Sequence, residues 1–293
     1  MSFLRRRGAP FVALLAAVGA LGVGCGGSSG SKAAPVIKVA TTNFAMTELV
    51  HGVGGTRVAV IDLAQGAADD RTLVLSPAQR SATDAAGLVV EVGGGWQPNI
   101  EAVAGTGSRV LALGLQGPAT GSQVWLDPVA MQSAAKALAA TLTALDPAGA
   151  GTYRNGLQDF NENLSSVSED YQSSLSDCAY NTVFTPDAAF ATVIARYGLK
   201  LYRVPAGGDS AGQDVAAAAA STQSFHGLFK EPPLASPPLV ALAARGKASL
   251  GQLDTMDGPP IKPEPASSTY VDRLEANLTA LIGGLYCQDS NGP

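Results

Sequence analysis

The sequence predicts an α/β fold: two lobes of mostly parallel sheet flanked by helices, joined by one long backbone helix. Three observations support this prediction. Short β-rich runs alternate with helical stretches, which is typical of parallel sheets. One apolar stripe of helical spacing then extends over about 30 residues, longer than an ordinary helix. The strand–helix alternation resumes after it, and 293 residues are enough for two domains.

The first lobe is expected to span residues 35–147. Its β-rich runs predict strands at 36–40, 57–63, 87–92 and 110–113. Helices are expected at 44–53 and 128–145. Pro128 suits the first turn of the second helix. The apolar residues of that helix recur on one face: Met131, Ala134, Ala135, Leu138 and Leu142.

The long backbone helix is expected at 148–177. Its apolar residues are separated by steps of three or four: Leu157, Phe160, Leu164, Val167, Tyr171 and Leu175. About 30 residues at 1.5 Å each make a rod of roughly 45 Å. A rod of that length can cross from one lobe to the other.

The second lobe is expected to span residues 178–293. Strands are predicted at 181–184, 199–204, 228–230 and 248–253, with helices at 188–197 and 238–244. Asp209 can cap a further helix that ends near residue 222. A Pro-rich loop precedes the final helix, whose apolar face carries Tyr270, Leu274, Leu278, Leu281 and Leu285.

Residues 1–24 have the features of a signal peptide. A positive segment at 5–7 precedes an apolar stretch at 11–23, which is too short to span a bilayer comfortably. Cys25 and the Gly/Ser run after it resemble a lipobox with its tether, although Gly22 stands where leucine is usual. We expect Cys25 to be lipidated and residues 25–34 to form a flexible tether. The alternative is a secreted protein with an incidental cysteine.

The other two cysteines are Cys178 and Cys287. Two cysteines left over in an oxidising compartment most simply form a disulfide with each other. That disulfide would join the start of the second lobe to the end of the last helix. The alternative is a pair of buried thiols.

Composition argues against several function classes. Lys and Arg total 19 against 24 acidic residues, a net charge of −5, so the basic surface that nucleic acid requires is missing. Two histidines, His51 and His226, are too few for a histidine-rich metal centre. The Gly-rich turn at 93–96 lacks the G-x-G-x-x-G spacing of a phosphate loop. We therefore expect a protein that is not an enzyme, with an extracytoplasmic enzyme as the weakest alternative.

Six short motifs occur in a fixed order along the mature chain. They are VATTNF (39–44), VWLDP (124–128), LDP (145–147) with Tyr153, ARYGLK (195–200), FKEP (229–232) and the segment 270–278. In this order they resemble the zinc/manganese-type solute-binding lipoproteins of bacterial ABC transporters. The resemblance implies a monomer on the outer side of the cell membrane, anchored by lipid, with an ABC permease and its ATPase as partners.

The resemblance also implies where a metal would lie. Family members hold it between the lobes with three histidines and a carboxylate. The corresponding positions here are Arg71, Gln123, Pro186 and Asp254, with Asp187 beside Pro186. Arginine offers only donors and proline has no ligating side-chain atom. Asp254 and Gln123 therefore remain as candidate metal ligands, to which Asp187 or Asp257 could be added.

Such a ligand set suits zinc poorly, because zinc prefers imidazole and thiolate. No cofactor is certain, and zinc or manganese remains the solute expected from the resemblance. One hypothesis is that Arg71 pairs with Asp254 in place of a metal. The alternative places Arg71 in solvent and Asp254 in an ordinary loop. The function is then either metal import or that of an accessory or interaction lipoprotein.

Overall fold

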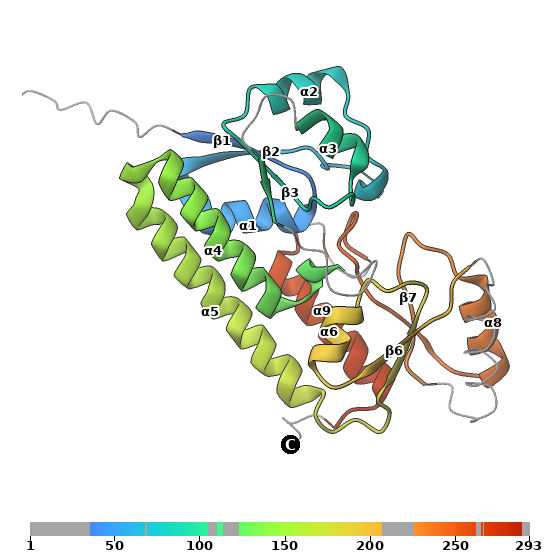
Figure 1. Ribbon diagram of the computed structural model, residues 1–293. Coiled ribbons are helices and arrows are strands. Elements are labelled where there is room, and N and C mark those ends of the chain that lie inside the picture. Colours follow the sequence, from blue (N-terminus) through green and yellow to red (C-terminus); the bar gives the residue numbers. More distant parts are fainter. Residues whose placement is uncertain are drawn as a thin grey trace, which may run out of the picture. The chain divides into compact units, whose positions relative to one another are not determined.

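The computed structural model describes residues 36–67, 69–104, 110–113, 123–206, 226–261, 265 and 267–288. Two four-stranded sheets, both parallel throughout, form two lobes that one long helix connects (Figure 1). This confirms the predicted fold class. Residues 1–35, which contain the expected signal peptide, Cys25 and its tether, lie outside the described residues.

The first sheet has the strand order β2-β1-β3-β4. Its strands are β1 (Ile37–Thr41), β2 (Val58–Asp62), β3 (Leu88–Glu91) and β4 (Val110–Ala112). β1 and β3 are central, and β3 is buried along its whole length. Strands of a parallel sheet carry apolar residues on both faces, which explains why apolar and polar residues do not alternate regularly along β3.

Four α-helices accompany this sheet: α1 (Phe44–Gly54), α2 (Pro77–Asp84), α3 (Pro98–Ala104) and α4 (Pro128–Leu145). The sequence predicted α1 and α4 but not α2 and α3. α2 buries only Thr83, so it has no apolar stripe to detect. Its real signal is the capping box, in which Ser76 and Gln79 satisfy each other's backbone N–H groups.

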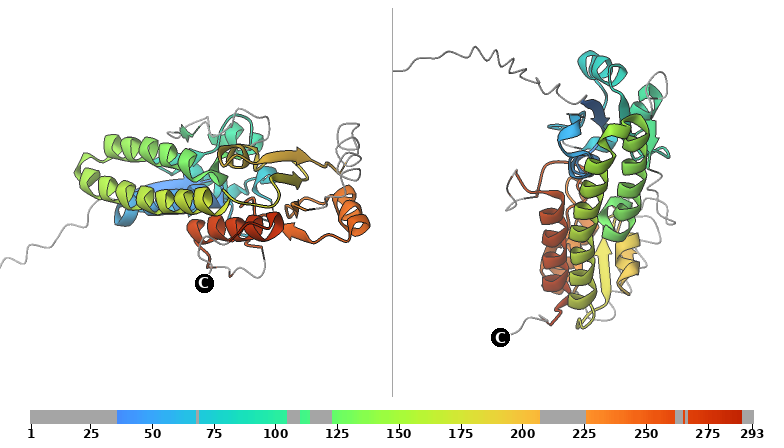
Figure 2. Two further views of the ribbon diagram at one scale, coloured as in Figure 1. Left: turned by 90° about the horizontal axis from the view of Figure 1, so that it is seen from below. Right: turned by 90° about the vertical axis from the view of Figure 1, so that its left-hand side faces the viewer.

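The long helix α5 (Ala150–Ser174) follows a 3₁₀ turn at Pro147–Gly149. It runs alongside α4 (Figure 2) and also packs against α1. Gly156 makes the second contact close, because a Cβ there would lie 2.5 Å from the Gly52 carbonyl oxygen. At its other end, the Tyr171 hydroxyl donates to the Leu274 carbonyl at 2.8 Å. α5 is therefore fixed to both lobes.

The second sheet has the strand order β6-β5-β7-β8. Its strands are β5 (Thr182–Thr185), β6 (Lys200–Arg203), β7 (Leu228–Lys230) and β8 (Leu250–Gln252). Its helices are α6 (Ala191–Arg196), α8 (Pro237–Gly246) and α9 (Tyr270–Leu285). The helix expected at 209–222 lies outside the described residues. Cys178 and Cys287 are joined by a disulfide at the end of α9.

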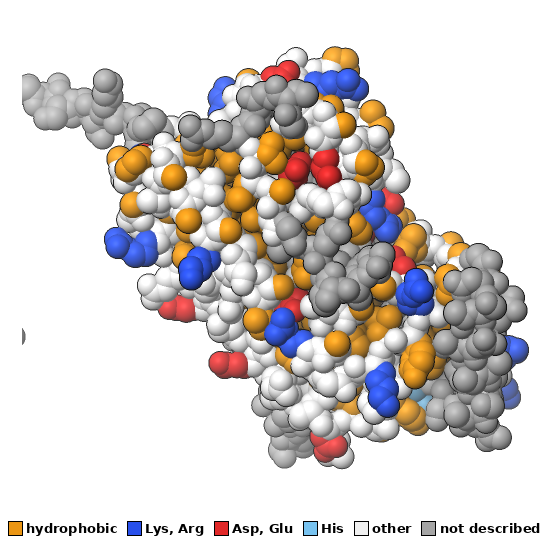
Figure 3. All heavy atoms as spheres, viewed as in Figure 1, with side chains coloured by type: hydrophobic (Ala, Val, Ile, Leu, Met, Phe, Trp, Pro, Cys, Tyr) orange, Lys and Arg blue, Asp and Glu red, His pale blue; other side chains and the backbone are white. Residues whose placement is uncertain are grey.

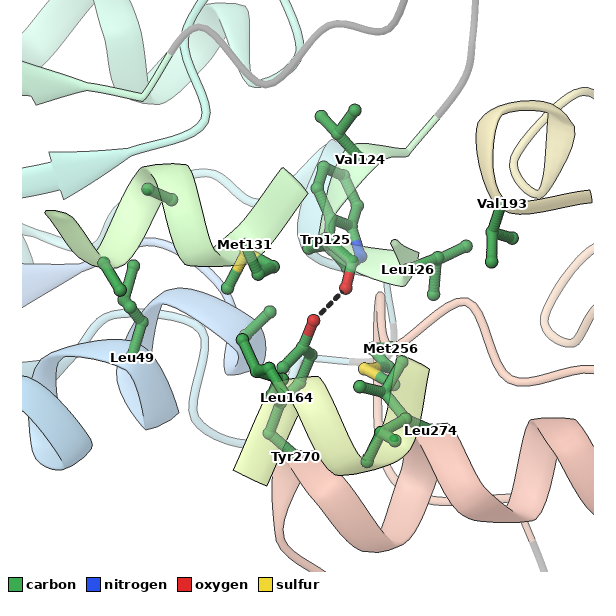
Figure 4. Packing of buried hydrophobic residues seen from close by; sticks show 14 of the residues in the cluster. Leu49, Val124, Trp125, Leu126, Met131, Leu164, Val193, Met256, Tyr270 and Leu274 are labelled. Carbon is green, nitrogen blue, oxygen red and sulfur yellow. Dashed lines mark hydrogen bonds between the residues drawn. The ribbon is translucent and has the colours of Figure 1, made fainter. Parts of the chain in front are cut away.

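A buried junction joins the two lobes at the VWLDP motif (Figure 4). The indole Nε1 of Trp125 donates to the Thr255 carbonyl at 3.0 Å. The Tyr270 hydroxyl, on α9, donates to the Trp125 carbonyl. Asp127 caps α4 and also accepts the Arg196 guanidinium at 2.7 Å. The motif thus belongs to the interface between the lobes.

The charged side chains on the face shown in Figure 3 are scattered, with acidic and basic residues interspersed. Over the described ranges, none of the helices combines the length and the apolar character needed to cross a bilayer.

Candidate functional site

The carboxyl ends of both sheets carry the polar residues of the site. Because all strands of a sheet are parallel, their carboxyl ends share one edge, where α/β proteins place ligands. β2 ends at Asp62, and the loop after it continues to Asp70 and Arg71. In the second lobe, Asp187 follows β5 and Asp254 follows β8. Contacts between these loops bring the two edges together.

Arg71 links the two lobes. Its backbone N–H and its Nε both donate to Asp69 Oδ1, at 3.0 and 3.1 Å, which fixes the side chain on the first lobe. The Nε also lies 3.5 Å from Asp257 Oδ2, and Nη1 lies 3.8 Å from Asp187 Oδ2. The guanidinium carbon is 5.6 Å from the centre of the Trp96 ring. One cation therefore faces two carboxylates of the second lobe.

Asp254 is held by a second arginine, Arg273 on α9. Nε and Nη2 of Arg273 donate to the two Asp254 oxygens at 2.7 Å each, in a bidentate fork. The Asp254 side chain is only 9% exposed, and the Arg273 side chain only 1%. Arg273 also donates to the Gly258 carbonyl at 3.1 Å and lies 4.4 Å from the Phe44 ring centre. Oδ1 of Asp254 additionally accepts the Met256 N–H at 2.8 Å.

The hypothesis of an Arg71–Asp254 pair is therefore wrong. Arg71 binds Asp69 and faces Asp257 and Asp187, while both oxygens of Asp254 are taken by Arg273. The reason is proximity, since Arg273 and Asp254 belong to the same lobe. A signal was present in the sequence: Arg273 is three residues after Tyr270, on the apolar face of α9, where a charge needs a partner.

Gln123 acts as a hydrogen-bond donor here. Its Nε2 donates to Asp257 Oδ2 at 2.8 Å, and its backbone N–H donates to the Ala189 carbonyl at 2.9 Å. Pro186 follows β5 directly and has no polar side-chain atom. Asp187, its neighbour, accepts the Ala189 N–H at 2.8 Å. Gln123 and Asp187 are therefore tied to the loops of the second lobe.

Three buried acids lie beside these residues, and burial favours the neutral form of each. Burial raises the pKa of Asp257 to about 7, against the opposing effect of Arg71 and the Gln123 hydrogen bond. Burial raises the pKa of Asp70 to about 9, and the nearby Asp257 adds to the rise. Burial and Asp187 hold the pKa of Glu231 well above its ordinary value. Sequence reasoning considered Asp257 but missed Asp70 and Glu231.

Metal ligation finds little support in this geometry. Over the described ranges, no group of three or more His, Cys, Asp or Glu side chains is placed to hold a metal ion. Of the two candidate ligands, Asp254 is engaged by Arg273, whereas Gln123 is held through its Nε2 and its Oε1 has no partner within the described residues. Of the two histidines, His51 is exposed on α1, and His226 stacks on Tyr180 at 4.0 Å between ring centres.

A comparison with known protein families identifies the family of this chain. Residues 39–284 match the family described as "Zinc-uptake complex component A periplasmic". The chain belongs to this family. Family members are metal-binding solute-binding proteins and transport components, and the family's description places them in the periplasm. A comparison with curated proteins found no match.

Solved structures show the same fold in the zinc-uptake family. The periplasmic zinc-binding protein TroA from Treponema pallidum is 18% identical, with a TM-score of 0.72 over 85% of this chain and 99% of that one. The laminin-binding protein of Streptococcus agalactiae, described as both adhesin and metal transporter, is 21% identical at a TM-score of 0.72, with the same coverage. A cadmium-bound periplasmic protein from Candidatus Liberibacter asiaticus is 17% identical at a TM-score of 0.74, again with that coverage.

Proposed function

We propose that the protein is an extracytoplasmic solute-binding lipoprotein, anchored through Cys25, that delivers a solute to an ABC permease and its ATPase. The family match over residues 39–284 carries this proposal. The two parallel-sheet lobes, whose carboxyl ends face each other, support it, because such edges are the usual ligand sites of α/β proteins. The apolar stretch at 11–23 followed by Cys25 supports the anchor.

The arginines argue against tight zinc capture. Where the family resemblance expects a ligand, Arg71 brings a permanent positive charge. To ligate zinc, Asp254 would have to leave Arg273, and removing one partner from a buried ion pair costs about 3–5 kcal/mol. The Oε1 of Gln123 has no partner within the described residues, but an amide oxygen is a poor ligand for zinc. We therefore propose that this chain keeps the scaffold of the family and no longer holds zinc as tightly as a histidine site does.

Calorimetric titration of the metal-stripped domain, residues 26–293, with zinc and then manganese tests this point. We expect no binding at concentrations of about tens of micromolar. Tight one-to-one binding that disappears in Asp254→Ala but persists in Asp84→Ala would overturn the proposal and restore zinc as the solute. Asp84 is a suitable control because it is exposed at the end of α2.

A second candidate function is that of an accessory or interaction lipoprotein without a transported solute. The Arg273–Asp254 fork favours it, because the fork already occupies both oxygens of the carboxylate that would bind a metal. Cross-linking in intact cells separates the two candidates. Recovery of an ABC permease supports delivery to a transporter, whereas reproducible recovery of a different class of membrane protein supports the accessory role.

The anchor has a test of its own. Cys25→Ser should move the protein from the membrane fraction to the medium or the periplasm, because lipidation needs the thiol. Labelling with a radioactive fatty acid should disappear at the same time. Membrane retention of Cys25→Ser without label would show that residues 1–24 or a partner hold the protein instead.

A further inference from the structure

A pocket of about 360 Å³ lies between the lobes, beside the residues described so far. That volume falls in the usual range of small-molecule sites. The loop after β2 forms one side, and the loop after β8 forms the other with the first turn of α9. Its lining residues are Phe44, Asp62, Asp70 and segment 64–67 from the first lobe, with segment 256–260 and Arg273 from the second.

The wall of this pocket carries more acidic than basic side chains. Asp62, Asp70 and Asp257 line it, against a single cation, Arg273. The charge of Arg273 is already balanced by Asp254 in the bidentate fork. In their ionised form these acids attract a cationic ligand, and a bound cation in turn favours the ionised form of the acids beside it.

Several polar atoms of the lining residues lack a partner within the described part of the chain. Asp70 is 2% exposed, yet neither of its carboxylate oxygens has a hydrogen-bond partner there. Oδ1 of Asp257 and Nη1 of Arg273 also lack a hydrogen-bond partner there, and these two residues are each 1% exposed. A buried polar group without a partner is destabilising, so binding of a ligand that supplies the missing hydrogen bonds is favoured.

The rest of the wall is apolar and held in place. Phe44, Met256, Pro259 and Pro260 line it. Met256 has a φ of 61°, a left-handed conformation that a side chain other than glycine or asparagine rarely adopts. Its backbone N–H is fixed to Asp254, and its side chain is fully buried. Such a conformation, held by its surroundings, is common in ligand sites.

We propose that this pocket binds a small organic ammonium ion. Its N–H groups would donate to Asp70 and Asp257, its aliphatic part would pack against Met256 and the two prolines, and a hydroxyl would accept from Nη1 of Arg273. A bare metal ion would leave the apolar wall and most of the volume unused. The inference rests on the proposed solute-binding function and names a class of solute for it.

Calorimetric titration with ethanolamine and 1,4-diaminobutane, both protonated at neutral pH, tests the inference on the wild-type domain. We expect dissociation constants of about 1 mM or below, with a matching rise in melting temperature. Ethylene glycol, which lacks the charge, and acetate, which has the opposite charge, should not bind. Tetramethylammonium, which has no N–H donor, should bind at least about tenfold more weakly than ethanolamine.

The variant Asp70→Asn keeps the size of the side chain and removes its ability to ionise. It should weaken ethanolamine binding at least about tenfold, while Asp84→Asn on the exposed end of α2 leaves it unchanged. Should Asp70→Asn fail to fold, Asp62→Asn at the half-buried edge of the pocket serves in its place. No heat from either amine with folded wild-type protein, or equal binding of ethylene glycol, would overturn the inference.

The two proposals fail separately. Absence of amine binding in a protein that cross-links to an ABC permease removes the ammonium site and leaves the importer role. Amine binding in a protein that cross-links to another class of protein removes the importer role and leaves the site. Competition with zinc is a third test. Zinc should not displace the amine, because the described residues of the pocket contain no group of acids placed to hold a metal ion.

Discussion

The two arginines at the interface between the lobes use the same chemistry in different ways. Arg273 pairs with Asp254 inside one lobe, at 2.7 Å in both contacts, and is almost fully buried. Arg71 is 21% exposed at its side chain, is held by Asp69 in its own lobe, and reaches the second lobe at 3.5 and 3.8 Å. The difference between the pairs is therefore one of burial and of geometry.

This difference separates a structural ion pair from an adjustable one. A buried fork cannot lose one partner without leaving an uncompensated charge in the interior. The longer contacts of Arg71 can open, because water reaches its guanidinium and Asp257 can take up a proton. We infer that Arg273 stabilises the second lobe, whereas Arg71 modulates the approach of the two lobes.

The largest expected effect comes from removing the buried cation. Arg273→Met should lower the free energy of unfolding by about 3–5 kcal/mol, because Asp254 then remains buried without its partner. Arg71→Met should lower it by only about 1 kcal/mol. Urea unfolding followed by circular dichroism measures both. Equal losses for the two variants would contradict the distinction between a structural and an adjustable pair.

Restoring metal ligands sharpens the comparison further. A variant with Arg71→His, Gln123→His and Pro186→His should bind zinc weakly, because Arg273 still occupies Asp254. Adding Arg273→Met should strengthen zinc binding about 100-fold by freeing that carboxylate. Calorimetry on the triple and quadruple variants, each shown to be folded, measures the ratio. An unchanged affinity would show that Asp254 lies outside the reach of the grafted site.

The acids around Arg71 predict a dependence of stability on pH. The pKa values of Asp257 and Asp70 are raised to about 7 and about 9, so between pH 4 and these values the folded state binds more protons than the unfolded state. Stability should therefore fall as pH rises through this window.

From pH 5.5 to 7.0 one such group contributes at most about 2 kcal/mol of this loss. Denaturant unfolding at a series of pH values measures it, and Asp70→Asn should flatten the slope. A slope that is unchanged in Asp70→Asn, or that rises with pH in the wild type, would show that Asp70 is ionised throughout.

The smallest expected effect is that of salt. Arg71→Lys should change stability by less than about 1 kcal/mol, and the difference from wild type should shrink in 1 M salt. Arg273→Lys should lose the bidentate geometry and cost more at every salt concentration. Thermal melts at low and high salt compare the two variants. A salt-sensitive Arg273→Lys would indicate that water reaches the buried fork.

The sequence predicted the lobes and the long helix because their apolar periodicity is strong. The stripe from Leu157 to Leu175 and the alternation of short strands with helices correspond to elements that bury one face. α2 and α3 were missed because they are short, and α2 is held by a capping box without an apolar stripe. Apolar periodicity along the sequence reveals only helices that bury one face, so a helix held by polar capping residues is not detected in this way.

The resemblance placed Arg71, Gln123 and Asp254 between the lobes as ligand positions, which remains a prediction. In the structure Arg71 and Gln123 contact residues of the second lobe, whereas Asp254 is bound within its own lobe. The partners depend on side-chain distances across elements far apart in sequence, such as Asp257 and Gln123, and spacing along the chain does not contain that information. Arg273 was the exception, since its place on an apolar helix face already required a nearby carboxylate.

The contact between Gly52 and Gly156 determines where one lobe can swing against the other. With the α5 backbone pressed against α1, most of the long helix moves as part of the first lobe. Any movement of the second lobe relative to α5 would then have to break contacts at the far end of the helix, such as the hydrogen bond from Tyr171 to α9. A methyl group added at Gly156 would push α5 away from α1. Because α5 also contacts α9, this shift would move the second lobe and change the width of the pocket between the lobes without touching any residue that lines it.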